Sequence, residues 1–316
     1  MTESELAQAL VTADNPFDVL FQALNDVWRA EGEVDVNRFF VEREKVTNQL
    51  ERFVLHVFFD LYDLLLARVR EARHEPRFAD WSGSVIVLDG ASLREANLLL
   101  SRLSMHGYAV ADYTYALSEV PSDTETFRQR VLGMPTIRTR ARWGEYTIVP
   151  IRSGEVPKLL PEALRLLVWI SYPDELLHKV RGKALTPQEA LDKTVAVLVE
   201  VLDMLEADEV LVTSDHGYLY IKSAALFWKA SPGDEKALRK LFGGKRALPI
   251  EEVGREFDKL RRVPRDRTYA LFDGEGCYIR GRYAWSVQRD PTDANHGGIS
   301  LMECLVPVMR IRREKR

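Results

Sequence analysis

The stretch that decides the fold is "EVLVTSDHGYLY", residues 209–220, in which an apolar run ends abruptly in polar and small residues. Short apolar runs bounded by turn residues are typical of strands that are buried on both faces. Such a strand needs helices on either side, so the run indicates an α/β fold with a mostly parallel sheet. A solvated turn would also explain Asp215, His216 and Gly217. A functional site is favoured only if residues of the same chemical type occur at corresponding places elsewhere.

The same pattern recurs from Trp81 onward, where short apolar runs alternate with amphipathic segments. Strands are predicted at residues 85–88, 108–116, 164–171 and 208–214, and helices at about 93–103, 123–132 and 187–205. Further strands are predicted near the end, at residues 268–273, 277–287 and 304–312. This alternation predicts a central, mostly parallel sheet flanked by helices.

The first 80 residues have a different character. Residues 16–74 show apolar residues at helical spacing and no strand alternation. Within them, residues 46–74 are broadly apolar, which predicts one long helix packed on more than one side. We therefore predict an N-terminal helical region at residues 1–80 and an α/β domain at residues 81–316. Its charged stretch at about 224–268, punctuated by glycine and proline, is predicted to be an insertion or cap.

Composition excludes several classes of protein. The net charge of −4 and the pI near 6.0 give no overall basic field of the kind that coats nucleic acid. The two cysteines, Cys277 and Cys304, lie in apolar runs, which suits a reducing compartment and argues against a disulfide framework or a thiolate metal site. No signal sequence and no run of roughly 18 apolar residues is evident. We expect a soluble cytoplasmic protein without membrane association.

Polar residues follow several predicted strands, where functional groups collect in α/β sheets. Asp174 and His178 are spaced i, i+4, so one face of a helical turn could present both to a single ion. Zn²⁺ and Mn²⁺ both accept carboxylate and imidazole ligands. Each feature alone has an ordinary explanation, such as a capping aspartate, but their regular order is a stronger signal. The residues concerned are Asp89, Asp174, His178, Asp215, His216 and His296.

A candidate nucleophile lies in "VPSDTETFRQRVLG", residues 120–133. Ser122 and Glu125 match a capping box, which predicts a helix that begins at Asp123. Thr124 would then lie in the first turn, where free N–H groups and the helix dipole attract phosphate. The alternative is that Thr124 is an ordinary first-turn residue.

Taken together and in order, these positions resemble the alkaline phosphatase superfamily, and more closely its PglZ branch. The resembling segments are "VIVLDGASLREA", "VPSDTETFRQRVLG", "YPDELLHK", "VTSDHGYLY" and "HGGISLMECLVPVM". The last is the most specific, because residues 296–303 match the His-Gly-Gly-x-Ser-x-x-Glu stretch of PglZ proteins throughout. The resemblance covers roughly residues 81–312, with looser matches at 133–163 and 224–268.

The resemblance implies two divalent metal ions, zinc in the first place with manganese as the alternative. Carried over residue by residue, Asp174, His178 and His296 would hold one ion, and Asp89, Asp215, His216 and the Thr124 oxygen the other. Thr124 would attack phosphorus and form a phosphothreonine. Gly217 would let the chain turn away without crowding the metal. Many relatives place an arginine nearer Asp89, so no phosphate contact is carried over to Arg94.

The resemblance further implies a metal-dependent phosphodiesterase or nuclease that acts on nucleotides or nucleic acid, with partner proteins in a phage-defence (BREX-type) system. The alternatives are a phosphomonoesterase and a non-catalytic, metal-stabilised interaction subunit of a defence complex. Arg138, Arg140 and Arg142 alternate beside Trp143, so on one strand they would share a face. They form either a charged edge strand or a basic lip that binds substrate. "GGKRALP", residues 243–249, is a further basic stretch.

Overall fold

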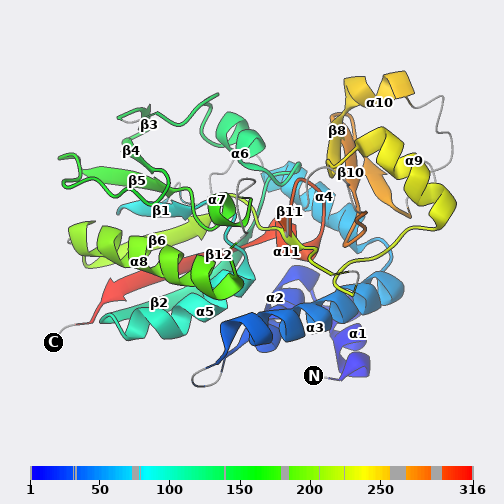
Figure 1. The fold of residues 1–316 in the computed structure, drawn as a ribbon, viewed down its shortest axis with the longest axis horizontal. Helices are drawn as coiled ribbons and strands as arrows, with labels where there is room; N and C mark the ends of the chain where they lie inside the picture. The colour runs from blue at the N-terminus through cyan, green and yellow to red at the C-terminus, as the bar shows by residue number, and fades with distance from the viewer. Residues whose placement is uncertain are drawn as a thin grey trace.

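The structure is a computed structural model, and it describes residues 2–314 apart from residues 31, 33, 73–77, 79, 139, 179–184, 206, 224, 257–267 and 286–293. Its centre is a seven-stranded sheet with the strand order β2-β12-β6-β1-β5-β4-β3 (Figure 1). The strands are β1 (Val85–Leu88), β2 (Tyr108–Leu117), β3 (Arg142–Trp143), β4 (Tyr146–Ile151), β5 (Arg165–Ile170), β6 (Glu209–Ser214) and β12 (Leu305–Arg313).

The middle of this sheet is parallel. β1 pairs in parallel with β5 and β6, and β4 pairs in parallel with β5. The outer strands are antiparallel, because β12 lies between β6 and β2 and runs against both, and β3 runs against β4. The predicted α/β class with a mostly parallel central sheet is confirmed.

Two details of the sheet differ from the prediction. β2 is an antiparallel edge strand with a half-exposed face rather than a strand buried on both sides. β4 was not predicted at all, although its register with β5 is continuous from Tyr146 to Ile151. Pro150 lies inside β4 and lowers its strand signal, since proline cannot donate to a sheet hydrogen bond.

Helices lie against the sheet, and the N-terminal helices form a group beside it (Figure 1). α5 (Leu93–Ser104) and α8 (Pro187–Leu205) match the predicted helices closely. The N-terminal helices are α1 (Glu3–Thr12), α2 (Pro16–Trp28), α3 (Val36–Val57) and α4 (Leu61–Glu71). The single long helix predicted at 46–74 is wrong, because the chain leaves the helical conformation at Phe58 and restarts at Leu61.

The N-terminal helices share their apolar cores with the sheet. Trp28, Phe39 and Phe40 pack in the same cluster as Ile86 and Leu88 of β1. A second cluster joins α1, α2 and α4 to the segment around α11 (Leu301–Cys304) and the start of β12. The domain boundary at residue 80 stays a prediction, and the described helices before it pack as part of the same core.

A smaller unit, which we call the cap, consists of α9 (Pro232–Phe242), β8 (Ala247–Pro249), α10 (Ile250–Glu256), β9 (Ala270–Phe272) and β10 (Gly276–Ile279). Its three strands form a separate sheet in the order β8-β10-β9, at the upper right of Figure 1. The predicted insertion therefore gains two strands from beyond residue 268. The strand predicted at 277–287 ends at Ile279, and the last two of its residues lie outside the described part of the chain.

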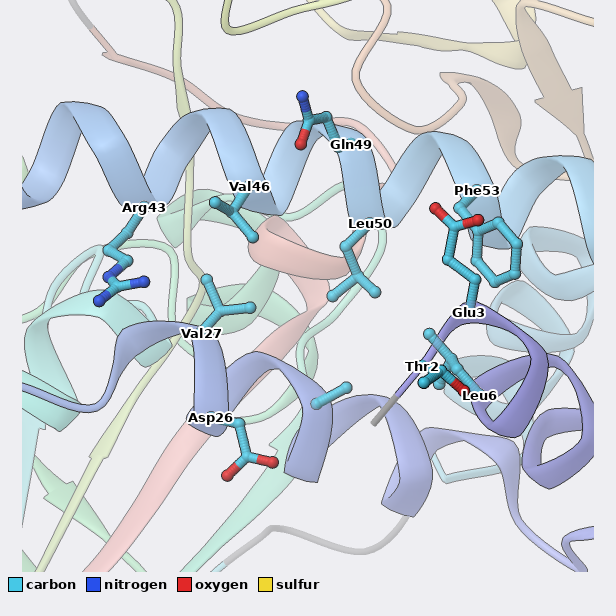
Figure 2. A pocket seen from close by; sticks show the side chains of 11 residues that line it. Thr2, Glu3, Leu6, Asp26, Val27, Arg43, Val46, Gln49, Leu50 and Phe53 are labelled. Carbon is cyan, nitrogen blue, oxygen red and sulfur yellow. The ribbon is translucent and has the colours of Figure 1, made fainter.

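A groove of about 370 Å³ lies among α1, α2 and α3 (Figure 2). Val27, Val46 and Leu50 point toward one another in it, and the charged side chains of Glu3, Asp26 and Arg43 also line it. None of the predicted site residues is among its lining residues. In the part of the chain that is described, no helix combines the length and the apolar character needed to cross a membrane.

Candidate metal centre

The candidate site lies where β1, β5 and β6 end together. Leu88, the last residue of β1, pairs with the last residues of both neighbouring strands, Ile170 and Ser214. Because the three strands end at the same level, the residues that follow them meet at one edge of the sheet. Asp89 and Asp215 follow β1 and β6 directly and therefore lie side by side.

Asp174 reaches the same edge through a tight contact with Gly90. The Asp174 N–H donates to the Asp89 carbonyl over 3.0 Å, and α7 (Asp174–Leu177) begins there. Gly90 has a φ of +72°, and a Cβ at this position would lie 2.8 Å from the Cβ of Asp174. Only glycine satisfies both conditions, so the "DG" turn after β1 sets how closely Asp174 approaches Asp89.

The first ligand group consists of Asp89, Asp215 and His216, whose ligand-type atoms lie within 4.8 Å of one another. The Thr124 hydroxyl lies among them. Its Oγ1 is 2.9 Å from Asp89 Oδ1, 2.8 Å from Asp215 Oδ2 and 3.1 Å from His216 Nε2. Two carboxylates, an imidazole and a hydroxyl thus converge from the ends of β1 and β6 and the start of α6 (Thr124–Arg130).

Each ligand in this group is oriented by a bond on its outer side. His216 Nδ1 donates to the Gly217 carbonyl over 2.9 Å, which directs Nε2 toward the site. Asp215 Oδ1 accepts the His216 N–H, and Asp89 Oδ2 accepts the Trp169 indole N–H over 3.2 Å. The inner atoms meet around the Thr124 hydroxyl, and outer partners of this kind are usual around metal-ligating side chains.

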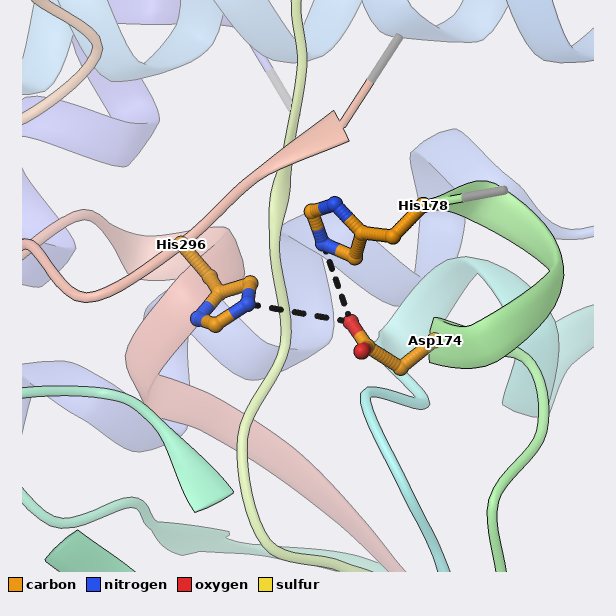
Figure 3. Close-up of side chains that lie close together, drawn as sticks. All are labelled: Asp174, His178 and His296. Atoms are coloured by element: carbon orange, nitrogen blue, oxygen red, sulfur yellow. Dashed lines mark ion pairs between the residues drawn. The ribbon is translucent and has the colours of Figure 1, made fainter. Parts of the chain in front are cut away.

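The second group consists of Asp174, His178 and His296 (Figure 3). Asp174 Oδ1 lies 3.2 Å from His178 Nε2 and 3.8 Å from His296 Nε2, and Figure 3 shows both rings pointing toward the carboxylate. Asp174 Oδ1 and His178 Nε2 are buried and have no well-aligned hydrogen-bond partner among the described residues. Buried polar atoms without partners are costly, and one ion would satisfy both. The donor set of one carboxylate and two imidazoles fits zinc or manganese.

The two groups adjoin one another. The rings of His216 and His296, one from each group, are stacked with their centroids 4.3 Å apart. The structure therefore brings all seven predicted ligand residues together in two neighbouring clusters.

The charges of the site explain the shifts in its pKa values. Burial lowers the pKa of His216, but the carboxylates of Asp215, Asp174 and Asp89 outweigh it and raise the value to about 9. Burial, followed by the charges of Asp215 and Asp174, raises the pKa of Asp89 well above its usual range. Burial and the charged His216 lower the pKa of His296 to about 4. Three carboxylates at one point create a demand for positive charge, which divalent cations would meet.

The helix that carries Thr124 is capped differently from the prediction. The N-cap is Asp123, whose Oδ1 accepts the Thr126 N–H over 2.7 Å, so α6 begins one residue later than expected. Ser122 instead accepts the Gly297 N–H and donates to the Gly298 carbonyl, both over 3.0 Å. Ser122 thus joins the start of α6 to the turn that carries His296.

The His-Gly-Gly-x-Ser-x-x-Glu segment owes its form to a buried ion pair. Glu303 is fully buried and accepts from Arg246 over 2.8 Å and 3.0 Å, and its Oε1 also accepts the Gly298 N–H over 2.9 Å. Ser300 caps α11. Arg246 belongs to the "GGKRALP" stretch, which indicates only a basic surface, and no local pattern there predicts its pairing with the motif's glutamate.

Two further interpretations change with the structure. A Cβ on Gly217 would lie 2.1 Å from the Met302 carbonyl, so packing against α11, rather than room for a metal, requires glycine there. Arg94 is fully buried, and its Nε donates to Glu44 over 3.0 Å, which agrees with the sequence analysis in assigning it no phosphate contact.

The three alternating arginines do not share a strand. Arg140 has a φ of +62° and Arg138 precedes a turn, so only Arg142 is in β3. Arg142 pairs with Thr147, near the start of β4 at the outer edge of the sheet. The side chains of all three are exposed. Their role in substrate binding stays a prediction.

The chain is similar to a few known proteins over part of its length. No protein-family model matches the chain. The chain is 24% identical over 131 residues to the alkaline phosphatase-like protein PglZ of Bacillus cereus, a match that covers 40% of this chain and 15% of that protein. The chain thus matches only a small part of that relative's length.

Similar solved structures include murine ectonucleotide pyrophosphatase/phosphodiesterase 5 (14% identity, 48% of this chain and 47% of that chain, TM-score 0.25). They also include a mutant of alkaline phosphatase PafA (9%, 48% and 40%, TM-score 0.29). Phosphonoacetate hydrolase from Sinorhizobium meliloti is a third (17%, 74% and 66%, TM-score 0.24).

The chain therefore combines a mixed sheet that has a parallel centre with two candidate groups of metal ligands at the sheet's edge. Over the matched part, its sequence is similar to that of the alkaline phosphatase-like protein PglZ.

Proposed function

We propose that this chain is a metal-dependent phosphodiesterase that acts on nucleotides or nucleic acid, with Thr124 as its nucleophile. The observation that carries the proposal is the position of the Thr124 hydroxyl. It is the first residue of α6, and its Oγ1 lies within 3.1 Å of atoms from Asp89, Asp215 and His216. A nucleophilic hydroxyl needs neighbouring groups that can accept its proton, and two carboxylates and an imidazole surround Thr124.

In the proposed first step, a carboxylate of the site takes the hydroxyl proton of Thr124, and the Thr124 oxygen attacks phosphorus. The Thr124 hydroxyl donates to Asp89 or Asp215, which leaves an oxygen lone pair free to attack phosphorus. The bond from Thr124 Oγ1 to phosphorus forms, the bond from phosphorus to the leaving oxygen breaks, and the hydroxyl proton passes to the carboxylate. Water then hydrolyses the phosphothreonine and restores Thr124. Divalent ions held by the two ligand groups would stabilise the entering and leaving oxygens.

The zinc or manganese ions of this proposal would be held by two sets of residues. Asp174, His178 and His296 form one set, and Asp89, Asp215 and His216, together with the Thr124 oxygen, form the other. Elemental analysis of purified protein beside an Asp215→Ala variant tests this assignment. The variant should retain fewer divalent ions per chain than the unaltered protein.

The nucleophile is tested with bis-p-nitrophenyl phosphate and p-nitrophenyl phosphate after chelation and re-addition of zinc or manganese. Thr124→Ala should lose at least about 10³-fold in kcat/KM, as expected when a residue that acts as a unit with its neighbours is removed. Thr124→Ser should keep measurable turnover, because it retains the hydroxyl. Full metal-dependent turnover by Thr124→Ala would refute the covalent step. Preference for the monoester by orders of magnitude would favour the phosphomonoesterase alternative.

We also propose that this chain has partner proteins in a phage-defence (BREX-type) system. This part of the proposal rests on the sequence similarity to PglZ. The groove among α1, α2 and α3 (Figure 2) favours the alternative of a non-catalytic interaction subunit, because apolar side chains line it. Metal-loaded protein that turns over no phosphoester but associates stably with proteins encoded beside it would support that alternative.

A further inference from the structure

A segment without regular secondary structure leads from β2 into the helix that begins at Thr124. It runs from residue 118 to residue 123 and belongs to neither a strand nor a helix. Val120, in its middle, is fully buried. The buried backbone groups of such a segment must pair with side chains or with other parts of the chain. Those contacts therefore decide where α6 begins and where the Thr124 hydroxyl lies.

Two arginines hold this segment at one atom, the carbonyl oxygen of Val120. Arg70 of α4 donates to it from Nη1 over 2.8 Å, and Arg130, the last residue of α6, donates from Nη1 over 2.9 Å. A backbone carbonyl oxygen has two lone pairs, so the two guanidinium groups use its full accepting capacity. We call the two arginines and this carbonyl the arginine clamp.

Two carboxylates of the cap hold the arginine clamp in place. Asp273 and Glu275 lie in the turn between β9 and β10. Arg70 Nε donates to Asp273 Oδ2 over 2.7 Å, and Arg130 Nη2 donates to Glu275 Oε2 over 2.5 Å. The side chains of Arg70 and Arg130 are only 16% and 28% exposed, and charge-assisted hydrogen bonds are stronger there than in open solvent.

Ser122 fixes the same segment to the metal centre. Its hydroxyl accepts the Gly297 N–H and donates to the Gly298 carbonyl, both over 3.0 Å. These two residues directly follow the ligand His296. The segment is thus held at two points, by the arginine clamp at residue 120 and by the motif turn at residue 122. Thr124 follows the second point by two residues.

We propose that Arg70 and Arg130 are positioning residues for the nucleophile, and that they place the Thr124 hydroxyl for attack by fixing the Val120 carbonyl. The inference rests on the proposed function and goes beyond it, because it gives the N-terminal helices and the cap a task in the reaction. A displacement of about 1 Å can lower a rate about 10²-fold, so the clamp has a large effect without any contact to substrate.

The test measures kcat and KM separately for bis-p-nitrophenyl phosphate with zinc-loaded protein. Arg70→Met should lower kcat about 10²-fold and leave KM and the zinc content nearly unchanged, because neither the metal ligands nor the substrate contacts are altered. The matched control is Arg68→Met on the same helix, where an exposed arginine lies 3.6 Å from Glu71. It should change neither kcat nor KM.

Chemical rescue separates a positioning role from a purely stabilising one. Arg70→Ala leaves room for a free guanidinium ion beside Val120 and Asp273. Guanidinium at a concentration that does not unfold the protein should raise the kcat of this variant about tenfold, the size expected for a hydrogen bond to a charged group. The same concentration should not raise the kcat of Arg68→Met. A failure of rescue would overturn the positioning role.

A double variant tests whether the two arginines act through one carbonyl. Arg130→Met should also lower kcat. Arg70→Met/Arg130→Met should lose less than the product of the two single losses, because residues that share a partner are coupled. Losses that multiply would show two independent effects and overturn the clamp.

The proposed function and the clamp fail in different ways. If the unaltered protein hydrolyses neither the diester nor p-nitrophenyl phosphate, the proposed function fails and the positioning role fails with it. If the unaltered protein is active but Arg70→Met keeps its kcat, or loses only unfolding free energy, the clamp is overturned while the phosphodiesterase stands. A loss of kcat in proportion to a loss of bound zinc would also overturn the clamp, because the arginine would then act on metal binding.

Discussion

Replacement of Gly90 by alanine should displace Asp174 and so weaken the second ligand group. Gly90 has a φ of +72°, and the new Cβ would lie 2.8 Å from Asp174 Cβ and 3.1 Å from its Oδ1. An L-residue in the left-handed region costs about 1–2 kcal/mol. The overpacked contact typically costs about a further 1–3 kcal/mol of stability. Because the contact is to the backbone-proximal Cβ of Asp174, rotation of its side chain cannot relieve it.

Gly107→Ala separates the two contributions. Gly107 has a similar φ of +79°, and a Cβ there would have nothing within 4 Å. It should lose only the conformational cost of about 1–2 kcal/mol and keep its metal affinity. Gly90→Ala should lose roughly 2–5 kcal/mol of unfolding free energy and bind zinc about 10–100-fold more weakly, as when a group that orients a ligand is altered.

Both quantities are measurable without an activity assay. Urea denaturation of the metal-free variants gives the unfolding free energies, and competition with a coloured chelator gives the zinc affinities. If Gly90→Ala and Gly107→Ala behave alike in both experiments, Asp174 does not depend on Gly90. The reasoning from the close approach would then be refuted.

Two other predictions concern the support and the charge of the centre. Glu303→Gln leaves the buried Arg246 without its charged partner and should cost about 3–5 kcal/mol in urea denaturation. Glu42→Gln, which breaks an exposed pair, should cost no more than about 0.5 kcal/mol. Equal costs would show that the buried pair is not what holds the motif. The pKa of His216 is raised to about 9, so a metal must displace its proton at neutral pH, and zinc affinity should rise by up to about tenfold per pH unit toward pH 9 and level off above it. Chelator competition from pH 6.5 to 9.5 checks this, and an affinity that is flat with pH would contradict it.

The sequence predicts the centre of the sheet well because burial on both faces leaves a direct signature. β1, β5 and β6 are continuous apolar runs, and their burial in the structure is nearly complete. The polar residues that follow them stand out against those runs. Because residues that follow neighbouring parallel strands lie at one edge of the sheet, these local signals are enough to bring Asp89 and Asp215 together.

Other features depend on contacts that no local pattern records. β2 joins the sheet only through β12, which is about 190 residues away in the chain, and nothing in β2 reveals that it runs antiparallel. The three arginines read as a strand because alternation ignores the positive φ at Arg140. Arg246 reads as surface charge because its partner Glu303 lies 57 residues further on. In each case the deciding interaction is distant in sequence.

Two buried glutamates in the N-terminal helices are a further feature that no local pattern predicts. Amphipathic spacing reports which helical face is apolar, so Glu44 and Glu51 of α3 would be expected to face solvent, yet both are fully buried. Glu44 accepts from Arg94, and Glu51 accepts from Arg282 and from the Leu301 N–H.

These buried charges connect α3 to the segments that carry the ligands. Arg94 also donates to the Tyr218 carbonyl over 2.8 Å, two residues after His216, and Leu301 follows His296 in the motif segment. Without α3, Arg94 and Arg282 would be left as buried charges without carboxylate partners, at a cost of several kcal/mol. The helices that look like a separate region in the sequence therefore supply counter-charges to the segments that carry the candidate ligands.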